Sequence, residues 1–167
     1  IHGQLGLRLK RLFDLFMAST MLMASIPIAI IVSILIKIFD KGPIIYKQIR
    51  IGLNGQNFKI YKFRSMQINS ENDGAKWTSI NDNRITKIGK FLRLTRIDEL
   101  PQLINVIRGD MSFIGPRPER PEFNEMLEQE IPYYQLRHLV RPGITGWAQV
   151  LYPYGASVDD AREKLKY

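Results

Sequence analysis

A carboxylate pair, Asp98-Glu99, stands in a stretch of the chain whose residue types suit phosphate chemistry. Four arginines surround the pair in sequence: Arg93, Arg96, Arg108 and Arg117. Guanidinium groups offer planar, bidentate donors to phosphate, and paired carboxylates suit a divalent metal that also binds phosphate oxygens. These residue types favour chemistry on a phosphorylated, metal-bound substrate. A solvated salt-bridge surface has a similar composition, so the stretch alone leaves both interpretations open.

A short helix is expected to position the two acids. Pro101 follows two residues after Glu99, apolar residues recur through Leu103 and Ile107, and Arg108-Gly109 closes the run. Proline in the first turn and glycine just past the end mark the start and stop of a helix. The acids would lie near its N-terminus, where backbone N–H groups favour negative charge. By this pattern alone, Asp98 could equally be a plain helix cap.

Two short β-type runs, residues 43–48 and 58–63, precede this region. They are joined through Asn54-Gly55, a strong hairpin signal. In the second run Lys62 and Arg64 alternate with aromatic residues, a pattern found both in nucleic-acid binding and in ordinary half-buried strands. Residues 67–84 are polar and are predicted to form a mobile surface loop.

The N-terminal part of the chain predicts a membrane anchor. Residues 12–36 are almost wholly apolar, about the length that crosses a bilayer core of roughly 30 Å. Pro27 interrupts the run, and basic residues flank both of its ends. Because equal basic flanks give no direction to a straight span, a bent helix that enters and returns is favoured over one that crosses. We therefore expect a re-entrant helical anchor at 1–41 and a catalytic domain at 42–167.

Composition narrows the function further. The chain has 167 residues, a net charge of +8 and no cysteine, so an anionic partner is expected and thiolate chemistry is excluded. Helical patterns recur at 85–93, from Pro121 to Ile131 and from Asp159, whereas 141–150 lacks a regular period. The predicted fold is mostly α with a small β-hairpin (α+β), with a re-entrant membrane helix and interfacial amphipathic helices. The sequence stops in what reads as mid-helix, so we expect a piece of a longer protein.

Three motifs carry a resemblance to a known family. They are FKIYKFRSM at 58–66, RIDELPQLINVIRGDMSFIGPRP at 96–118 and RPGITGWAQV at 141–150. With them the chain closely resembles the bacterial sugar transferase family, the monotopic phosphoglycosyl transferases, and YPYGAS at 152–157 is similar to its exopolysaccharide branch. The resemblance implies transfer of a sugar-1-phosphate from a UDP-sugar to undecaprenyl phosphate, with release of UMP. It also implies Mg²⁺ as cofactor and a place at the cytoplasmic face of the bacterial inner membrane.

Site roles follow from the same resemblance. Asp98 would attack the sugar-linked phosphate and form an aspartyl phospho-sugar intermediate, and Glu99 would help hold the metal or accept a proton. Arg93 and Arg117 match phosphate- and nucleotide-binding arginines of the family, and Lys62 and Arg64 are further candidates for substrate binding. One departure is Ile26 directly before Pro27, where many members have serine; here Ser25 stands one residue earlier.

Two rival interpretations stay open. In one, the chain is a membrane-tethered basic module that binds nucleic acid or anionic lipid without catalysis, although this leaves Asp98-Glu99 unexplained. In the other, transfer is direct and Asp98 serves only as a metal ligand. The preferred interpretation includes membrane lipid as a partner and no nucleic acid, and it leaves the identity of the sugar and a homo-oligomeric state open.

Overall fold

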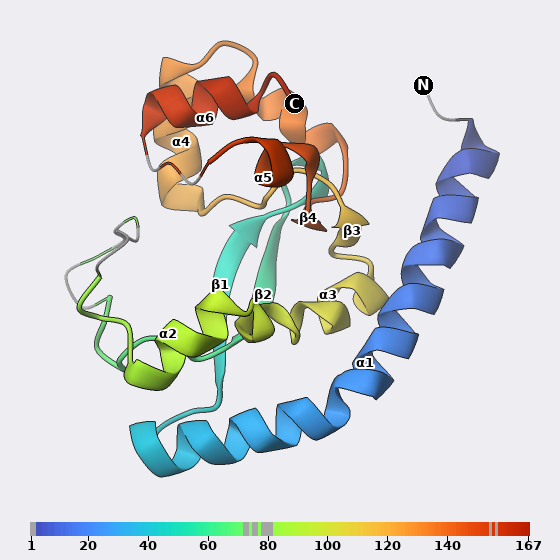
Figure 1. The fold of residues 1–167 in the computed structure, drawn as a ribbon. Helices are drawn as coiled ribbons and strands as arrows, with labels where there is room; N and C mark the ends of the chain where they lie inside the picture. Colours follow the sequence, from blue (N-terminus) through green and yellow to red (C-terminus); the bar gives the residue numbers. More distant parts are fainter. Residues whose placement is uncertain (1–2, 72–73, 75–76, 78–81, 154, 156) are drawn as a thin grey trace.

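The computed structural model describes residues 3–71, 74, 77, 82–153, 155 and 157–167 (Figure 1). A long helix lies along one side, a β-hairpin runs through the middle, and short helices form an upper lobe and a lower layer. The elements in chain order are α1 Gln4–Asp40, β1 Ile45–Ile51, η1 Leu53–Gly55, β2 Asn57–Phe63, α2 Lys87–Leu94, η2 Ile97–Glu99, α3 Gln102–Arg108, β3 Ser112–Ile114, α4 Pro121–Glu130, η3 Tyr134–Leu139, β4 Gly143–Thr145, α5 Trp147–Leu151 and α6 Val158–Lys164.

Helix α1 is bent near its middle, and its two halves wrap the lower part of the molecule (Figure 1). Pro27 lies inside the helix and has no N–H to donate to the preceding turn, which explains the bend. The hydroxyl of Ser25 donates to the Leu22 carbonyl at 2.8 Å. Within the described residues α1 alone is long and apolar enough to cross a membrane, and only 17% of its most apolar window is buried. Such exposure is unlike that of a core helix in a soluble protein.

The first half of α1 is fixed to the rest of the chain by polar contacts. Asp14 is buried and accepts from the Phe113 backbone N–H at 3.2 Å, and Lys10 lies 3.5 Å from the same carboxylate. Arg11 donates to the carbonyls of Val106 and Ile107, at 2.6 and 2.8 Å, at the end of α3. These bonds satisfy carbonyls that a helix C-terminus leaves free, so α1 and α3 are held in one arrangement.

The predicted hairpin is confirmed. Strands β1 and β2 pair antiparallel from Ile45–Phe63 to Ile51–Asn57, and Gly55 takes the left-handed conformation that the turn needs. Below the hairpin, two apolar clusters join it to α1 and to the helices that follow. The first consists of Ala18, Ile60, Leu103, Val106 and Met111, and the second of Val32, Ile36, Phe63 and Leu92. The hairpin therefore has a fixed position relative to α1.

One sequence expectation is wrong. Residues 141–150 are not irregular throughout, because they include strand β4 and helix α5. Strand β4 pairs in parallel with β3, with Ser112 opposite Gly143 and Ile114 opposite Thr145. A Cβ at Gly115 would collide with the carbonyl of Arg141, so only glycine permits this approach. A pairing of two three-residue strands leaves almost no periodic signal in the sequence.

The upper lobe has its own small core. Leu127 and Ile131, at the end of α4, pack on Tyr134, and Val158 and Ala161 of α6 cover them. The fold is thus mostly helical with a small antiparallel hairpin, as predicted at that level. The isolated bridge Met66–Ile85 joins the two ends of the loop at 67–84. The described residues of this loop include turns, and 72–73, 75–76 and 78–81 lie outside the described residues.

Candidate active site

The carboxylate pair lies in a tight turn. Asp98 and Glu99 belong to the 3-10 segment η2, which Arg96 opens in the left-handed conformation with φ 59°. Helix α3 begins after Pro101 and ends at Gly109, whose φ of 94° closes the helix as the sequence predicts. Neither η2 nor α3 has a side-chain cap bond at its start. The interpretation of Asp98 as a plain helix cap is therefore wrong.

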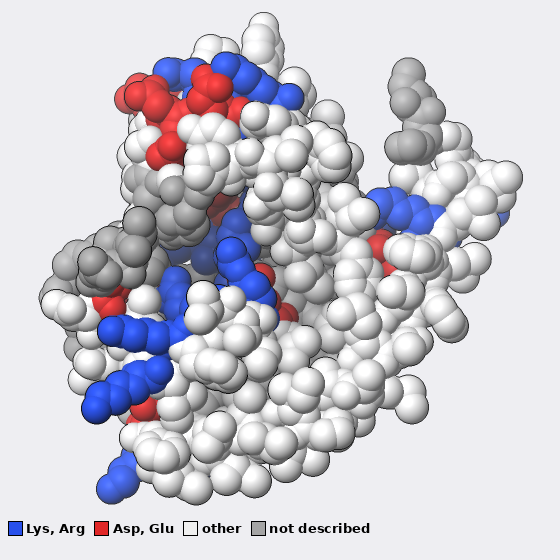
Figure 2. Space-filling view, in the orientation of Figure 1, with Lys and Arg blue, Asp and Glu red and all other residues white. Residues whose placement is uncertain are grey.

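A large cleft of about 1280 Å³ opens beside this turn, between the upper lobe and the lower helices. Figure 2 shows Lys and Arg side chains gathered in and around the hollow. All six residues predicted from the sequence line it: Lys62, Arg64, Arg93, Asp98, Glu99 and Arg117. Among the described residues, eleven lysines and arginines line the cleft against four acids, so the cleft favours an anionic ligand.

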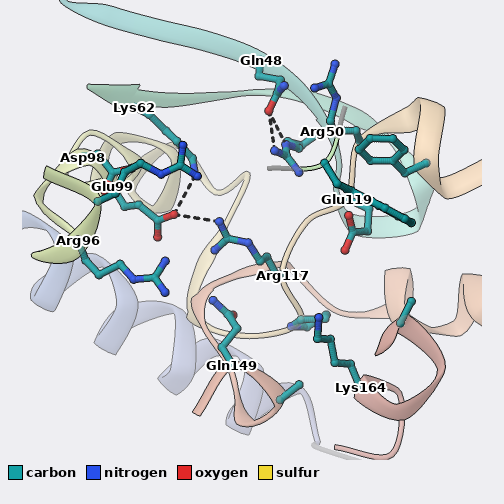
Figure 3. Close-up of a pocket in the computed structure, with 18 of the residues that line it drawn as sticks. Gln48, Arg50, Lys62, Arg96, Asp98, Glu99, Arg117, Glu119, Gln149 and Lys164 are labelled. Atoms are coloured by element: carbon teal, nitrogen blue, oxygen red, sulfur yellow. Dashed lines mark hydrogen bonds and ion pairs between the residues drawn. The ribbon is translucent and has the colours of Figure 1, made fainter. Parts of the chain in front are cut away.

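Glu99 is the electrostatic centre of the cleft. Its Oε1 atom accepts from Lys62 Nζ at 2.8 Å and from Arg117 Nη2 at 3.0 Å (Figure 3). Burial alone would raise the pKa of Glu99, but the charges and hydrogen bonds of Arg117 and Lys62 hold it well below its usual range. Glu99 is therefore ionised, and it holds two cations from distant parts of the chain at one point.

The pKa of Lys62 is also lowered, which for an ammonium disfavours the charged form. Burial and, after it, the nearby charge of Arg117 lower the pKa of its ammonium to about 8, while the charge and hydrogen bond of Glu99 oppose the shift. Strand β2 carries Lys62, and the proline-rich Gly115-Pro116-Arg117-Pro118 segment that follows β3 carries Arg117. The charge of Lys62 in the cleft therefore depends on pH in the mildly alkaline range.

Asp98 lies in a different environment. It is 6% exposed, and within the described residues its Oδ1 atom is buried and has no hydrogen-bond partner. Burial raises the pKa of Asp98, the positive charge of Lys62 opposes this shift, and the neighbouring Glu99 charge adds to it. A desolvated carboxylate with an oxygen free of hydrogen bonds is more basic and more nucleophilic than a solvated one.

The same oxygen bears on metal binding. A magnesium ion takes oxygen ligands, commonly one or two carboxylates together with substrate phosphates. Asp98 offers its unpartnered oxygen and Glu99 adjoins it, so the residues fit such an ion completed by phosphate oxygens. The described residues contain no group of three or more His, Cys, Asp or Glu that would hold a metal by themselves.

The other predicted arginines occupy distinct places. Arg64 is buried and donates to the Asp40 carbonyl at 3.1 Å, and within the described residues its Nε and Nη1 atoms have no partner. Arg93 and Arg96 line the cleft close to η2. Arg108 lies outside it and donates to the Tyr61 hydroxyl at 2.7 Å. The structure thus brings together all of the basic residues around the pair except Arg108.

Sequence reasoning missed a second basic group on the far wall of the cleft. It consists of Arg50, Arg120 and Arg137. Arg50 donates to the Gln48 side chain and to the Pro118 carbonyl, and its pKa is lowered to about 10 by burial and by the charge of Arg117. These arginines lie far apart in the sequence and belong to no common motif. The only signal that could have indicated them is the net positive charge of the chain.

Hydrogen bonds hold this second group in place. Arg120 bonds Glu71 at 2.8 Å, and Arg137 donates to the Arg117 carbonyl at 2.7 Å. An aromatic pair lies alongside, because the rings of Trp77 and Phe123 have centroids 4.9 Å apart and Arg120 lies over Phe123. Fixed guanidinium groups beside aromatic faces suit a ligand that combines phosphate with a planar ring.

The fold and the site together define a class of protein in which a carboxylate pair lines a cationic cleft and a long apolar helix belongs to the same fold. The chain belongs to the bacterial sugar transferase family, whose model matches residues 5–167. The family expected from the motifs is confirmed.

Curated relatives agree with this assignment. One from Aeromonas hydrophila is 46% identical over 95% of the chain and 38% of the relative, and it is named a UDP-N-acetylgalactosamine-undecaprenyl-phosphate N-acetylgalactosaminephosphotransferase. One from Escherichia coli (strain K12), named a UDP-glucose:undecaprenyl-phosphate glucose-1-phosphate transferase, is 44% identical over 85% of the chain and 31% of the relative. An exopolysaccharide production protein of Rhizobium leguminosarum bv. phaseoli is 43% identical over 87% of the chain and 75% of the relative. The chain therefore spans 38% and 31% of the length of the first two of these relatives.

Proposed function

We propose that the chain transfers a sugar-1-phosphate from a UDP-sugar to undecaprenyl phosphate, giving a polyprenyl-diphospho-sugar and UMP. This would be the first committed step of exopolysaccharide or glycoconjugate assembly. The proposal rests on the contrast between the two acids. Glu99 is ionised and forms ion pairs with Lys62 and Arg117, whereas Asp98 is desolvated and has an unpartnered oxygen. The names of the relatives support the donor and acceptor classes.

In the proposed first step, a carboxylate oxygen of Asp98 attacks the phosphorus that carries the sugar. A bond forms between that oxygen and phosphorus, and the bond to the bridging oxygen of the diphosphate breaks, so UMP leaves. In the second step, a phosphate oxygen of undecaprenyl phosphate attacks the same phosphorus and releases Asp98. An acyl phosphate is reactive enough to be passed on in this way.

Glu99 and the cations prepare the site for both steps. Lys62 and Arg117, fixed by Glu99, lie where they can offset the negative charge that develops on the transferred phosphoryl group. Asp98 and Glu99 would hold Mg²⁺ together with phosphate oxygens. When bound, that ion supplies further neutralisation of charge and helps to orient the diphosphate.

The far wall of the cleft fits the rest of the donor. Arg50, Arg120 and Arg137 offer donors to the nucleotide phosphates, and Trp77 and Phe123 offer aromatic faces to a uracil ring. A volume of about 1280 Å³ leaves room for a nucleotide and a sugar together, since pockets for small ligands commonly measure about 300–1,000 Å³. The relatives named for glucose and for N-acetylgalactosamine use different sugars, so the sugar must be found by assay.

Helix α1 would place this chemistry at a lipid surface. The surface over the lower half of α1 carries almost no charged side chains (Figure 2). Phe91 and Leu94 on α2 are 59% and 84% exposed, which suits a short helix lying in the membrane interface. We propose that α1 enters and leaves the cytoplasmic face of the bacterial inner membrane, with Pro27 at the bend.

Cysteine labelling tests this topology, because the natural chain has no cysteine. Gly3→Cys precedes α1, and Asn57→Cys lies beyond it on an exposed part of β2. If α1 re-enters, a membrane-impermeant maleimide will label both variants in inside-out vesicles and neither in intact cells. Labelling of Gly3→Cys in intact cells, with Asn57→Cys protected, would instead establish a straight span. The unmodified chain serves as the blank.

A UMP-release screen tests the proposed reaction. The purified protein is incubated with Mg²⁺, undecaprenyl phosphate and one of four donors: UDP-glucose, UDP-galactose or their N-acetyl counterparts. Release of UMP with one donor, dependent on the acceptor for sustained turnover, supports the proposal. A module that only binds anionic lipid or nucleic acid releases none with any donor. Formation of the polyprenyl-diphospho-sugar, followed by mass spectrometry, excludes simple hydrolysis.

The pKa of Lys62 gives an expected pH dependence. Above pH 8 its ammonium loses a proton and with it the charge that attracts a diphosphate. We expect the affinity for UDP, measured by calorimetry without metal, to fall about tenfold between pH 7.5 and pH 9. In Lys62→Arg the side chain stays charged throughout this range, so its affinity should change little. Equal losses in both proteins would show that Lys62 is not the titrating group.

A further inference from the structure

A second cavity, of about 450 Å³, lies between α1 and the β3–β4–α5 region. Most of its wall is apolar and comes from Met21, Leu100, Leu103, Phe113 and Ile144. Met21 belongs to the apolar helix itself and is 41% exposed, so the wall continues onto the surface of α1. The cavity therefore extends from the surface of α1 to residues between α1 and the β3–β4 pair.

The polar end of this cavity is shared with the large cleft. Arg96, Glu99 and Gln149 line both. In Figure 3, Arg96 and Gln149 lie on the side of Glu99 nearest α1, whereas Arg50 and Glu119 lie across the cleft. Gln149 is fixed by donating to the Ile144 carbonyl at 3.1 Å, and within the described residues its Oε1 atom is buried and unpartnered. The two cavities thus meet at Glu99.

We propose that this second cavity binds the first isoprenoid units of the acceptor lipid, so that donor and acceptor reach Asp98-Glu99 from opposite sides. The inference rests on the proposed function, which it extends by giving the acceptor a path. An amphiphile with one apolar chain and a terminal phosphate matches a cavity that is apolar at α1 and ends at Arg96. The UDP-sugar has no apolar part to match that wall and fits the cationic cleft instead.

The size of the cavity sets a limit on what it holds. A volume of about 450 Å³ is near the lower end of the usual range for ligand pockets, about 300–1,000 Å³. It accommodates the start of the polyprenyl chain, and the remaining units would extend along α1 into the lipid. The apparent affinity should therefore increase over the first few isoprenoid units and change little beyond them.

Filling the cavity from α1 tests the inference. Met21→Trp places a large rigid ring at the inner rim, and Met23→Trp is the matched control, because Met23 is 71% exposed on the same helix and does not line the cavity. We expect Met21→Trp to raise the KM for undecaprenyl phosphate about tenfold or more and to leave the KM for the UDP-sugar within about twofold. Met23→Trp should match the natural chain in both. Identical kinetics of the two variants, with the natural chain active, would overturn the inference.

Photolabelling supplies a readout that does not need turnover. A prenyl phosphate with a diazirine on its first isoprenoid unit is irradiated with the full chain in phosphatidylcholine nanodiscs. Adducts on the residues that line the cavity (Met21, Leu100, Leu103, Phe113, Ile144 or Thr145), reduced by undecaprenyl phosphate but not by phosphatidic acid, support the inference. Adducts elsewhere, or equal competition by phosphatidic acid, would overturn it. If the natural chain releases no UMP from any donor, the proposed function fails, and the labelling pattern alone then decides whether the cavity binds prenyl phosphate.

Discussion

Asp98→Asn is expected to reduce the rate of UMP formation by about 10⁴-fold or more. The amide keeps the size and shape of the side chain but loses the negative charge and the nucleophilic oxygen. Because Asp98 has a buried oxygen without a hydrogen-bond partner, the substitution removes chemistry and breaks no bond formed by that atom. The measurement is UMP release under saturating donor and acceptor, together with thermal unfolding to show that the fold is intact.

Asp159→Asn is the matched control, since the Asp159 side chain is exposed on α6, and it should retain full activity. A second measurement separates covalent from direct transfer. With donor but no acceptor, the natural chain should accumulate a phospho-sugar adduct on Asp98, detected by peptide mass spectrometry. Activity of Asp98→Asn close to that of the natural chain would refute the assignment of Asp98 as nucleophile. Full activity of the natural chain without any adduct would favour direct transfer.

Glu99→Gln is expected to have the second largest effect, a loss of about 10²- to 10⁴-fold in kcat. One oxygen of Glu99 accepts from both Lys62 and Arg117, and its pKa lies well below the usual range. A neutral amide leaves the two cations without their shared counter-charge, so their side chains will separate. The variant should also need more Mg²⁺ for half-maximal activity, which a magnesium titration of the rate measures.

The control for this substitution is Glu125→Gln on the exposed face of α4, which should behave like the natural chain. A structural role alone would lower the thermal stability of Glu99→Gln and leave its magnesium requirement unchanged. A shift in the magnesium titration at unchanged kcat would assign Glu99 to metal binding alone. Normal values for both quantities would remove Glu99 from the mechanism.

Local patterns in the sequence were sufficient for much of this molecule. Pro101 and Gly109 predicted the bounds of α3 to within a residue, because proline and glycine restrict backbone conformation wherever they occur. Asn54-Gly55 predicted the hairpin for the same reason. The doublet Asp98-Glu99 was identified by its residue types, and its position shortly before Pro101 placed it near the start of a helix, whereas the structure places it in the 3-10 segment that precedes α3.

Other parts of the site could not be read from local patterns. Arg50, Arg120 and Arg137 come from three separate elements, and only the folded chain places them on one wall of the cleft. The parallel pairing of β3 with β4 depends on glycines that allow two backbones to approach, and it places Gln149 in the wall of the cavities that Glu99 also lines. Such contacts join residues far apart in sequence, and no periodicity records them.

The sequence by itself determined the residue types of the reacting centre, the apolar helix with its proline, and the short elements whose ends are marked by proline or glycine. Tertiary structure decided the unequal environments of Asp98 and Glu99, the lowered pKa of Lys62 and the meeting of two cavities at Glu99. The physical reason is that backbone preferences act over a few residues. Desolvation and charge interactions depend on which distant side chains the packing of α1, the hairpin and the upper lobe brings together.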